Sequence, residues 1–454
     1  LQHIVLWDQA GLIKRFVSIP LVVVLLLCVL ARLTLAADQN KQLTTADPSG
    51  KIFSLSECVA IALDTSPQIL YSQADIIQKQ YSLESSKKNL YPSFFFDYGY
   101  RYTPDAYEPY GVIENYYNYS FSIEQPIYRG RSLVTGVELG ELDLESSKAS
   151  MAQTQNDIIL AVHEAYYNLL KTRKFEEVAI QSVEERKAHL KDAQAFYKAG
   201  LIPKNDMLQS EVQLSGAQIE LLRAKNLSTM ALAQLNTLLR RPVETQIEVE
   251  DVFKYEPSEI SWELAVQQAK KYRPELRQSE IAIEQADKNI ILTRAPYLPA
   301  VSVSATYLKQ GDNFIAQEYP FGPTEVKTAL ATLEWRFWAW GQSKDEMAAA
   351  RYNKKKIQEN QSELLDNITL QVRGAYVDTL EAAYNIGVTE KAIESAEEDF
   401  RINQSRYKAQ LGTTTNVLDA QTRLTRAKIE YFNALYNYRI SLMRLAWSTG
   451  TLTL

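Results

Sequence analysis

Histidine and cysteine are scarce in this chain of 454 residues, which holds three histidines and two cysteines. Metal centres commonly draw on these residue types at close spacing, and no Cys/His cluster occurs in the sequence. His163 and His189 lie far apart along one segment with a helical pattern, so we interpret both as solvated helix residues and not as ligands. The sequence therefore predicts no metal site.

A glycine-rich phosphate loop is also missing, since none follows a segment that reads as a strand. Acidic pairs do occur, at 176–177 and 184–185, but we interpret them as helix-surface charge. An excess of positive charge is absent as well, because 49 Lys and Arg stand against 55 Asp and Glu, a net charge of −6. We therefore expect no catalytic residue, no cofactor and no nucleic-acid partner.

A long apolar run occurs at residues 16–30, directly behind a basic pair at 14–15. The run is short for a membrane span, and small residues suited to cleavage follow it near Ala36 and Ala37. This layout predicts a signal peptide over residues 1–37. The alternative is an uncleaved anchor that tethers a periplasmic coiled-coil structural protein to the inner membrane.

The chain repeats itself at a spacing of 210 residues (407 − 197). Tyr-Lys-Ala occurs at 197–199 and again at 407–409, each time before a short breaker segment and a return of the helical pattern. Further matches at the same spacing extend over both flanking helices, and Pro67 and Pro92 have counterparts at positions 274 and 299. We interpret the mature chain as two tandem copies of one unit: 38–242 and 262–454, joined by a linker at 243–261.

Each copy reads as helix, two strands, a long helix, a turn and a return helix. No proline interrupts residues 130–199, which predicts a helix about 100 Å long. Residues 205–240 predict a return helix of about 55 Å. The polar faces of these helices are wide, which is typical of coiled-coil walls and not of a buried core.

The turns between these helices contain helix breakers. Gly200 and Pro203 break the first long helix, and Gly412 breaks the second. We expect Asn205 and Thr415 to be the N-caps of the return helices.

The predicted strands alternate between an aromatic or aliphatic face and a polar face. They cover about residues 94–102, 117–124, 301–307 and 328–337, and the 27 tyrosines of the chain are dense between Tyr91 and Tyr128. Each is about the length that crosses a bilayer when tilted. Four strands have open edges, which lipid does not tolerate, so they must close with other chains. Twelve strands from three chains would leave a lumen, whereas eight from two chains would fill their own interior.

The fold class we predict is therefore mainly α with a membrane β-barrel. Three chains with four strands each form a 12-stranded barrel that continues into a long α-helical coiled-coil tunnel.

The order and doubled spacing of these motifs resemble the TolC family of outer-membrane efflux proteins over nearly all of the mature chain. The resemblance rests on the strand starts "NLYPSF" and "PYLPAV", on "EQPIYRGR" and "AYYNLLK", and on both hairpin turns. It implies a homotrimeric exit duct in the outer membrane, with a periplasmic helical extension, that conducts substrates passively from the periplasm or a pump to the outside. The implied partners are outer-membrane lipid, a periplasmic adaptor (membrane fusion) protein and an inner-membrane pump of the RND or ABC type. The duct would serve tripartite efflux or type I secretion.

The resemblance also implies a periplasmic gate near the turns, tied by links between the two hairpins. Asp206 matches the family's aspartate in the first hairpin, and Tyr407 matches its tyrosine partner. We expect a hydrogen bond between them to hold the gate shut, and its loss to open the channel. Asn205 matches a threonine whose arginine partner is replaced here by Gly412, so we expect the second link to be absent.

Acidic rings line the constriction in this family. Asp419 matches one ring position, whereas the other is the neutral Asn416. Three carboxylates in place of six would surround the axis, and we expect them to attract cations.

The hairpin turns match the place where adaptors dock in this family. The resemblance assigns adaptor docking to four tip residues, although turn residues would look the same if they only shaped the turn: Gly200, Leu201, Gly412 and Thr413. The sequence does not distinguish between drugs, metal ions, small metabolites and polypeptides as the cargo.

Overall fold

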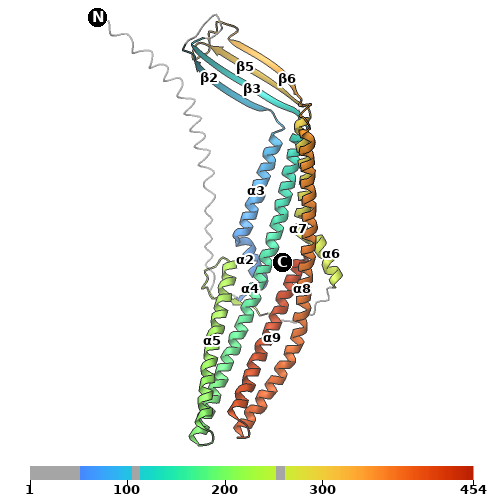
Figure 1. The fold of residues 1–454 in the computed structure, drawn as a ribbon. Coiled ribbons are helices and arrows are strands. Elements are labelled where there is room, and N and C mark those ends of the chain that lie inside the picture. Colours follow the sequence, from blue (N-terminus) through green and yellow to red (C-terminus); the bar gives the residue numbers. More distant parts are fainter. Residues whose placement is uncertain (1–51, 105–112, 252–260, 453–454) are drawn as a thin grey trace, which may run out of the picture. The chain divides into compact units, whose positions relative to one another are not determined.

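The computed structural model describes residues 52–104, 113–251 and 261–452. The predicted signal peptide lies outside these residues. Two halves of the described chain have the same order of elements, followed by colour in Figure 1. The first half contains α2 (Leu55–Thr65), α3 (Pro67–Lys88), β2 (Ser93–Tyr102), β3 (Asn115–Arg129), α4 (Ser132–Lys198) and α5 (Lys204–Leu238). The second half contains α6 (Trp262–Tyr272), α7 (Pro274–Arg294), β5 (Ala300–Gly311), β6 (Glu325–Glu334), α8 (Gln342–Lys408) and α9 (Thr414–Ser448).

The long helices match in length between the halves. α4 and α8 have 67 residues each, and α5 and α9 have 35 each. The predicted long helix and return helix are confirmed to within a few residues at their ends. Pro67 and Pro274 each stand at the first position of a helix, where a missing N–H costs nothing, and so separate α2 from α3 and α6 from α7.

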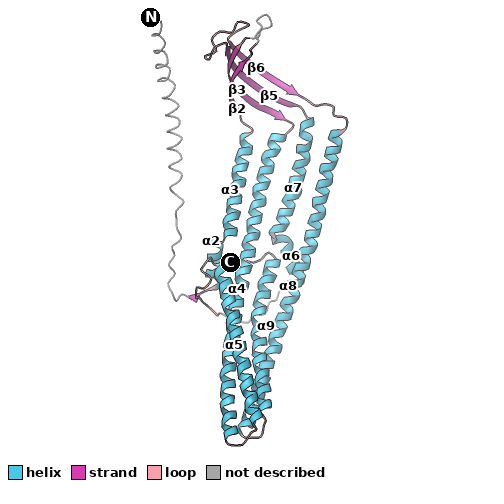
Figure 2. Cartoon of the chain, turned by 60° about the vertical axis from the view of Figure 1, so that its left-hand side comes forward, coloured by secondary structure: helices cyan, strands magenta, loops and turns pink. Residues whose placement is uncertain are grey.

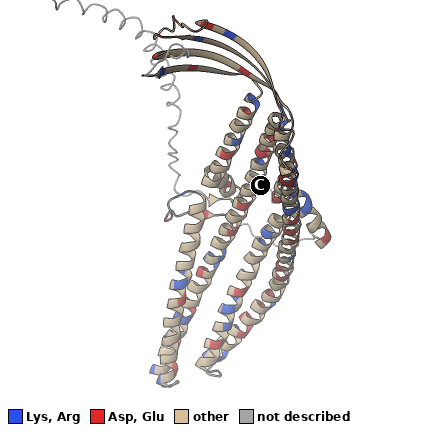
Figure 3. Ribbon diagram, turned by 45° about the horizontal axis from the view of Figure 1, so that its top comes forward, with Lys and Arg blue, Asp and Glu red and all other residues tan. Residues whose placement is uncertain are grey.

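Helices and strands follow the same lateral order. The four-stranded sheet has the order β2-β3-β5-β6, and the helices that continue from it pack as α3-α4-α7-α8 (Figure 2). Beyond the middle of the long helices, α5 pairs with α4, α9 pairs with α8, and α4 packs on α9. Charged residues of both signs are spread along these helices (Figure 3), as expected for walls exposed to water.

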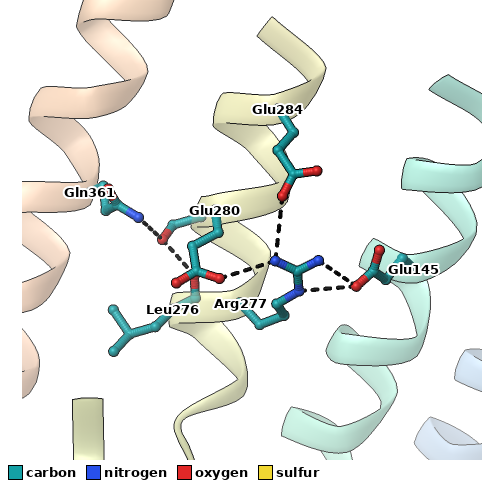
Figure 4. A network of polar contacts seen from close by, with 7 residues as sticks. Glu145, Leu276, Arg277, Glu280, Glu284 and Gln361 are labelled. Atoms are coloured by element: carbon teal, nitrogen blue, oxygen red, sulfur yellow. Dashed lines mark hydrogen bonds and ion pairs between the residues drawn. The ribbon is translucent and has the colours of Figure 1, made fainter. Parts of the chain in front are cut away.

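Polar contacts tie α7 to both long helices. The Arg277 guanidinium donates to Glu145 of α4 at 2.6 Å and to Glu280 and Glu284 of its own helix (Figure 4). These hydrogen bonds, first of all the one to Glu145, raise the pKa of Arg277. On α8, Lys354 pairs with Asp287 of α7 at 2.7 Å. Exposed ion pairs of this kind add little stability, so their main effect is to set the register of α7 between its neighbours.

The largest apolar core lies at the middle of the long helices, where α2, α4, α5 and α9 meet. Cys58, Val162 and Leu235 have no exposed surface there. The Tyr166 hydroxyl donates to the carbonyls of Phe53 and Glu250 and so holds two short parallel strands, β1 (Ile52–Phe53) and β4 (Glu248–Val249), against the core. The largest core of the helical walls therefore lies at mid-length.

The strand register aligns the two faces predicted from the sequence. Phe96, Phe121 and Tyr307 stand opposite one another on one face, and Asp97 stands opposite Ser120 on the other. β3 is longer than predicted, and β6 ends earlier: Trp335 and Phe337 lie beyond it. Glu334 pairs with Ala300, the first residue of β5, so no strand remains to pair with the residues that follow. No helix within the described ranges is long and apolar enough to cross a membrane.

Candidate functional site

The tips of the two helical hairpins have the same backbone geometry. α4 ends at Lys198, after which Gly200 takes a left-handed conformation with φ of 71°. The amides of Gly200 and Leu201 donate to the carbonyls of Tyr197 and Phe196, both at 2.9 Å. This pair of hydrogen bonds is the Schellman motif, which satisfies carbonyls at a helix end.

The second tip repeats this motif with a different residue in the left-handed position. α8 ends at Lys408, and Gln410 adopts φ of 61°, with its amide bonded to the carbonyl of Tyr407 at 2.9 Å. The prediction that Gly412 breaks this helix was therefore wrong, because the helix has already ended when Gly412 is reached. Glycine is the usual residue in the left-handed position after a helix. The sequence therefore carried no signal that Gln410 occupies this position.

The return helices also begin earlier than predicted. Pro203 occupies the N-cap position of α5 and Thr413 that of α9, where the Thr413 hydroxyl accepts from the amide of Asn416 at 3.3 Å. Asn205 and Thr415 lie inside the first turns, so their prediction as N-caps was wrong. Of the four tip residues assigned to docking, Thr413 thus has a clear structural role as a cap.

Exposed leucines occupy the same place in both turns. Leu201 is 51% exposed and Leu411 is 72% exposed. Leu411 was missed by the sequence analysis, although it follows Gln410 just as Leu201 follows Gly200. Two apolar side chains at equivalent exposed positions give both tips a similar contact surface.

Tyr407 is buried between the hairpins. Its ring lies 4.8 Å from that of His189 and 5.4 Å from that of Phe196, measured between centroids, and 3% of the residue is exposed. Burial raises the pKa of Tyr407; the nearby Thr414 hydroxyl offsets part of that rise, and the charges of Asp192 and Asp206 add to it.

The predicted hydrogen bond between Asp206 and Tyr407 is absent within one chain. The Tyr407 and Thr414 hydroxyls are both buried, and neither completes a hydrogen bond of acceptable geometry among the described residues. Asp206 lies in the first turn of α5 and is half-buried, so it acts on Tyr407 through its charge alone. Of the other matched positions, Asn205 and Asn416 have exposed side chains in the first turns of α5 and α9, and Asp419 is exposed in the second turn of α9.

A second group of polar residues joins the hairpins farther from the tips. The Arg186 guanidinium, on α4, donates to Gln213 of α5 at 2.5 Å and to the Thr422 hydroxyl of α9 at 3.2 Å. The Gln421 amide of α9 donates to Glu185 of α4 at 3.1 Å. Sequence reasoning missed these residues, since nothing in their local pattern distinguishes them from ordinary helix-surface residues.

The two histidines are not solvated as predicted. His189 is buried, with 7% of its surface exposed, and burial lowers its pKa. His163 is half-buried, and burial lowers its pKa to about 4. Neighbouring helices cover both side chains, which the pattern of one helix cannot reveal. Among the described residues, no group of three or more His, Cys, Asp or Glu side chains could hold a metal ion.

The model of one protein family, described as outer membrane efflux protein, matches residues 59–239 and again residues 265–451. The chain belongs to this family. It is thus an outer-membrane efflux channel with a periplasmic helical extension. This membership decides against the tethered coiled-coil protein that the sequence left open.

Individual relatives of this outer membrane efflux protein are distant in sequence. The outer membrane protein TolC of Vibrio cholerae is 21% identical over 409 residues, which cover 88% of this chain and 91% of that protein. The CmeC outer membrane channel of Campylobacter jejuni has the same fold, with a TM-score of 0.78 at 16% identity over 87% of this chain and 85% of that one. The MtrE channel of Neisseria gonorrhoeae gives a TM-score of 0.74 at 16% identity over 88% of this chain and 91% of that one.

Proposed function

We propose that three copies of this chain form one continuous duct, with a 12-stranded barrel in the outer membrane and a helical tunnel below it. The observation that carries the proposal is the shared lateral order of strands and helices, β2-β3-β5-β6 above α3-α4-α7-α8. A curved layer with this order and two free edges is one segment of a closed wall. The duct conducts its cargo passively, and the two halves of each chain are tandem copies of one unit.

The edges of the layer support head-to-tail closure. β2 and β6 each have one side without a strand partner among the described residues, and an unpaired edge is not tolerated in lipid. The helices at the same edges expose large apolar side chains, as listed here for α3 and α8: Leu70, Tyr71, Ile77, Tyr81, Tyr352, Leu370, Leu380 and Tyr384. A neighbouring copy that pairs β6 with β2 would also cover these side chains.

The aromatic and aliphatic face of the sheet suits contact with lipid, because it carries Phe96, Phe121 and Tyr307 in register. The opposite, polar face then lines the lumen. Twelve strands leave such a lumen open, whereas eight would fill it with side chains.

A periplasmic adaptor protein and an inner-membrane pump of the RND or ABC type would complete the export path. The docking surface we propose for the adaptor consists of the hairpin tips, at Gly200, Leu201, Gly412 and Thr413, to which the structure adds Leu411 by its equivalent position. The gate we propose lies just above the tips. It comprises Asp206 and Tyr407 at the contact between hairpins, with the exposed Asn205, Asn416 and Asp419 in the first two turns of the return helices.

Crosslinking between the sheet edges tests the assembly. Tyr100→Cys on β2 combined with Ala329→Cys on β6 should give covalent dimers and trimers with a short bismaleimide in outer-membrane extracts. Cys58 will not interfere, because burial raises its pKa to about 11 and leaves the thiol unreactive.

The matched control joins inner strands. Ser122→Cys on β3 and Thr306→Cys on β5 are direct partners within one chain, so they should give no covalent oligomer. A native mass in detergent that corresponds to a monomer or dimer, or oligomers from the control pair alone, would refute the proposed wall.

A further inference from the structure

His189 lies inside the contact between the two hairpins, which we call the hairpin contact and define by seven residues: Glu185, Arg186, His189, Tyr407, Thr414, Gln421 and Thr422. The imidazole stacks against Tyr407 of α8 at 4.8 Å between ring centroids, although its own helix is α4. Its Nε2 atom is buried and has no hydrogen-bond partner among the described residues. A change in the charge of this ring therefore acts directly on the packing of one hairpin against the other.

Charged groups of both signs lie near His189, but none of them forms an ion pair with the imidazole among the described residues. On α4 itself, Arg186 disfavours a positive charge and Asp192 favours it, while the Glu185 carboxylate, one turn earlier, accepts a hydrogen bond from Gln421. From α8 the ring faces the Tyr407 hydroxyl, and α9 contributes the neutral Thr414 and Gln421 to the contact. From α5 come the neutral Gln213, which binds Arg186, and Asp206, whose charge acts on Tyr407.

The hairpin contact holds several buried polar atoms that lack hydrogen-bond partners within the described part of the chain. Besides His189 Nε2, they are the hydroxyls of Tyr407 and Thr414 and the Oε1 atom of Gln421. Arg186, 8% exposed, keeps its charge in this contact with hydrogen bonds to neutral oxygens only. These polar atoms and the Arg186 charge are better solvated by water than by the closed contact. Separation of the hairpins would hydrate them and so lower their desolvation free energy.

We propose that His189 makes opening of the channel proton-dependent: it is neutral while the hairpin contact is closed and takes up a proton from solvent when the contact opens. The inference rests on the gate proposed above, and it names the proton as the chemical signal to which that gate responds. Acid on the periplasmic side then favours the open channel.

The sign follows from linkage between protonation and opening. Burial lowers the pKa of His189 in the closed contact, and exposure on opening returns it towards its ordinary value of 6.5. The open form therefore binds more protons below that value and gains population as the pH falls. If the closed contact keeps His189 neutral down to pH 5.5, full exposure raises the ratio of open to closed states by at most about tenfold per subunit between pH 7.5 and pH 5.5.

Conductance of the assembled trimer in planar bilayers measures this response. The open probability of the parent channel should rise between pH 7.5 and pH 5.5 on the periplasmic side. His189→Gln stays neutral at both values, so its open probability should be the same at pH 7.5 and at pH 5.5. His163→Gln is the matched control, because it replaces the other histidine of the same helix outside the hairpin contact and should keep the parent's response.

Each outcome decides the matter. An open probability in the parent that is flat or falls with acid overturns the proposal without any variant. A response that survives in both His189→Gln and a second variant, His189→Asn, assigns it to carboxylates and also overturns the proposal. Absence of any channel, or of a trimer, in the parent would instead refute the proposed duct, so failure of the two ideas can be told apart.

Discussion

Replacement of Tyr407 by phenylalanine is expected to hold the channel closed more firmly. The resemblance to the family implied the reverse, since it assigned to this hydroxyl a hydrogen bond with Asp206. In the structure the hydroxyl is buried beside His189, Phe196 and Thr414, and it completes no hydrogen bond of acceptable geometry among the described residues. Tyr407→Phe therefore removes a polar group that opening would hydrate, and the cost of closing falls.

The size of this shift towards the closed channel follows from the free energy of burying a hydroxyl without a hydrogen bond, which is unfavourable by about 1–3 kcal/mol. Each chain should then shift the ratio of closed to open states about 5- to 150-fold. If the three subunits open together, the shifts multiply. The packing of the ring on His189 is kept, so little of this gain is lost to a cavity.

Single-channel recording at pH 7.5, with trimer content checked by native mass, is the assay. The control is Tyr197→Phe, because Tyr197 is the equivalent residue of the first hairpin and is 39% exposed. Its hydroxyl already reaches water, so the variant should conduct like the parent. A higher open probability in Tyr407→Phe would refute the reasoning and would show that the assembled trimer supplies Asp206 or another acceptor to this hydroxyl.

Three further predictions concern the tips. Gln410→Gly should stabilise the second hairpin by about 1 kcal/mol, measured as resistance of the purified trimer to thermal unfolding, because glycine takes the positive φ of this position without strain; equal or lower stability would argue against a strained turn. Asp419→Ala should weaken cation selectivity in bilayers and block by multivalent cations, most clearly at low salt, and unchanged selectivity would place the constriction elsewhere. Leu201→Ser combined with Leu411→Ser should stop export while the trimer still assembles, and full export would exclude the tips as the adaptor surface.

Local sequence signals predicted the elements of this fold well. The matched prolines at 67 and 274 each start a helix, and the spacing of 210 residues recurs in two tips with the same hydrogen bonds. Alternation along the strands placed Phe96 and Phe121 on one face, which the register bears out. These features depend on neighbours a few residues away, so one segment at a time carries enough information.

The sequence by itself thus determined the length and order of the helices, the two faces of the strands and the family. Only the tertiary structure decided the state of the side chains at the gate. Arg186 binds Thr422, which is 236 residues away, and His189 is covered by Tyr407 from a different helix. Burial and hydrogen bonding depend on which helix packs against a residue, and the wide polar faces of these helices allow many pairings. The physical reason is that contact between distant segments, and not the pattern within one of them, sets the solvation of each polar group.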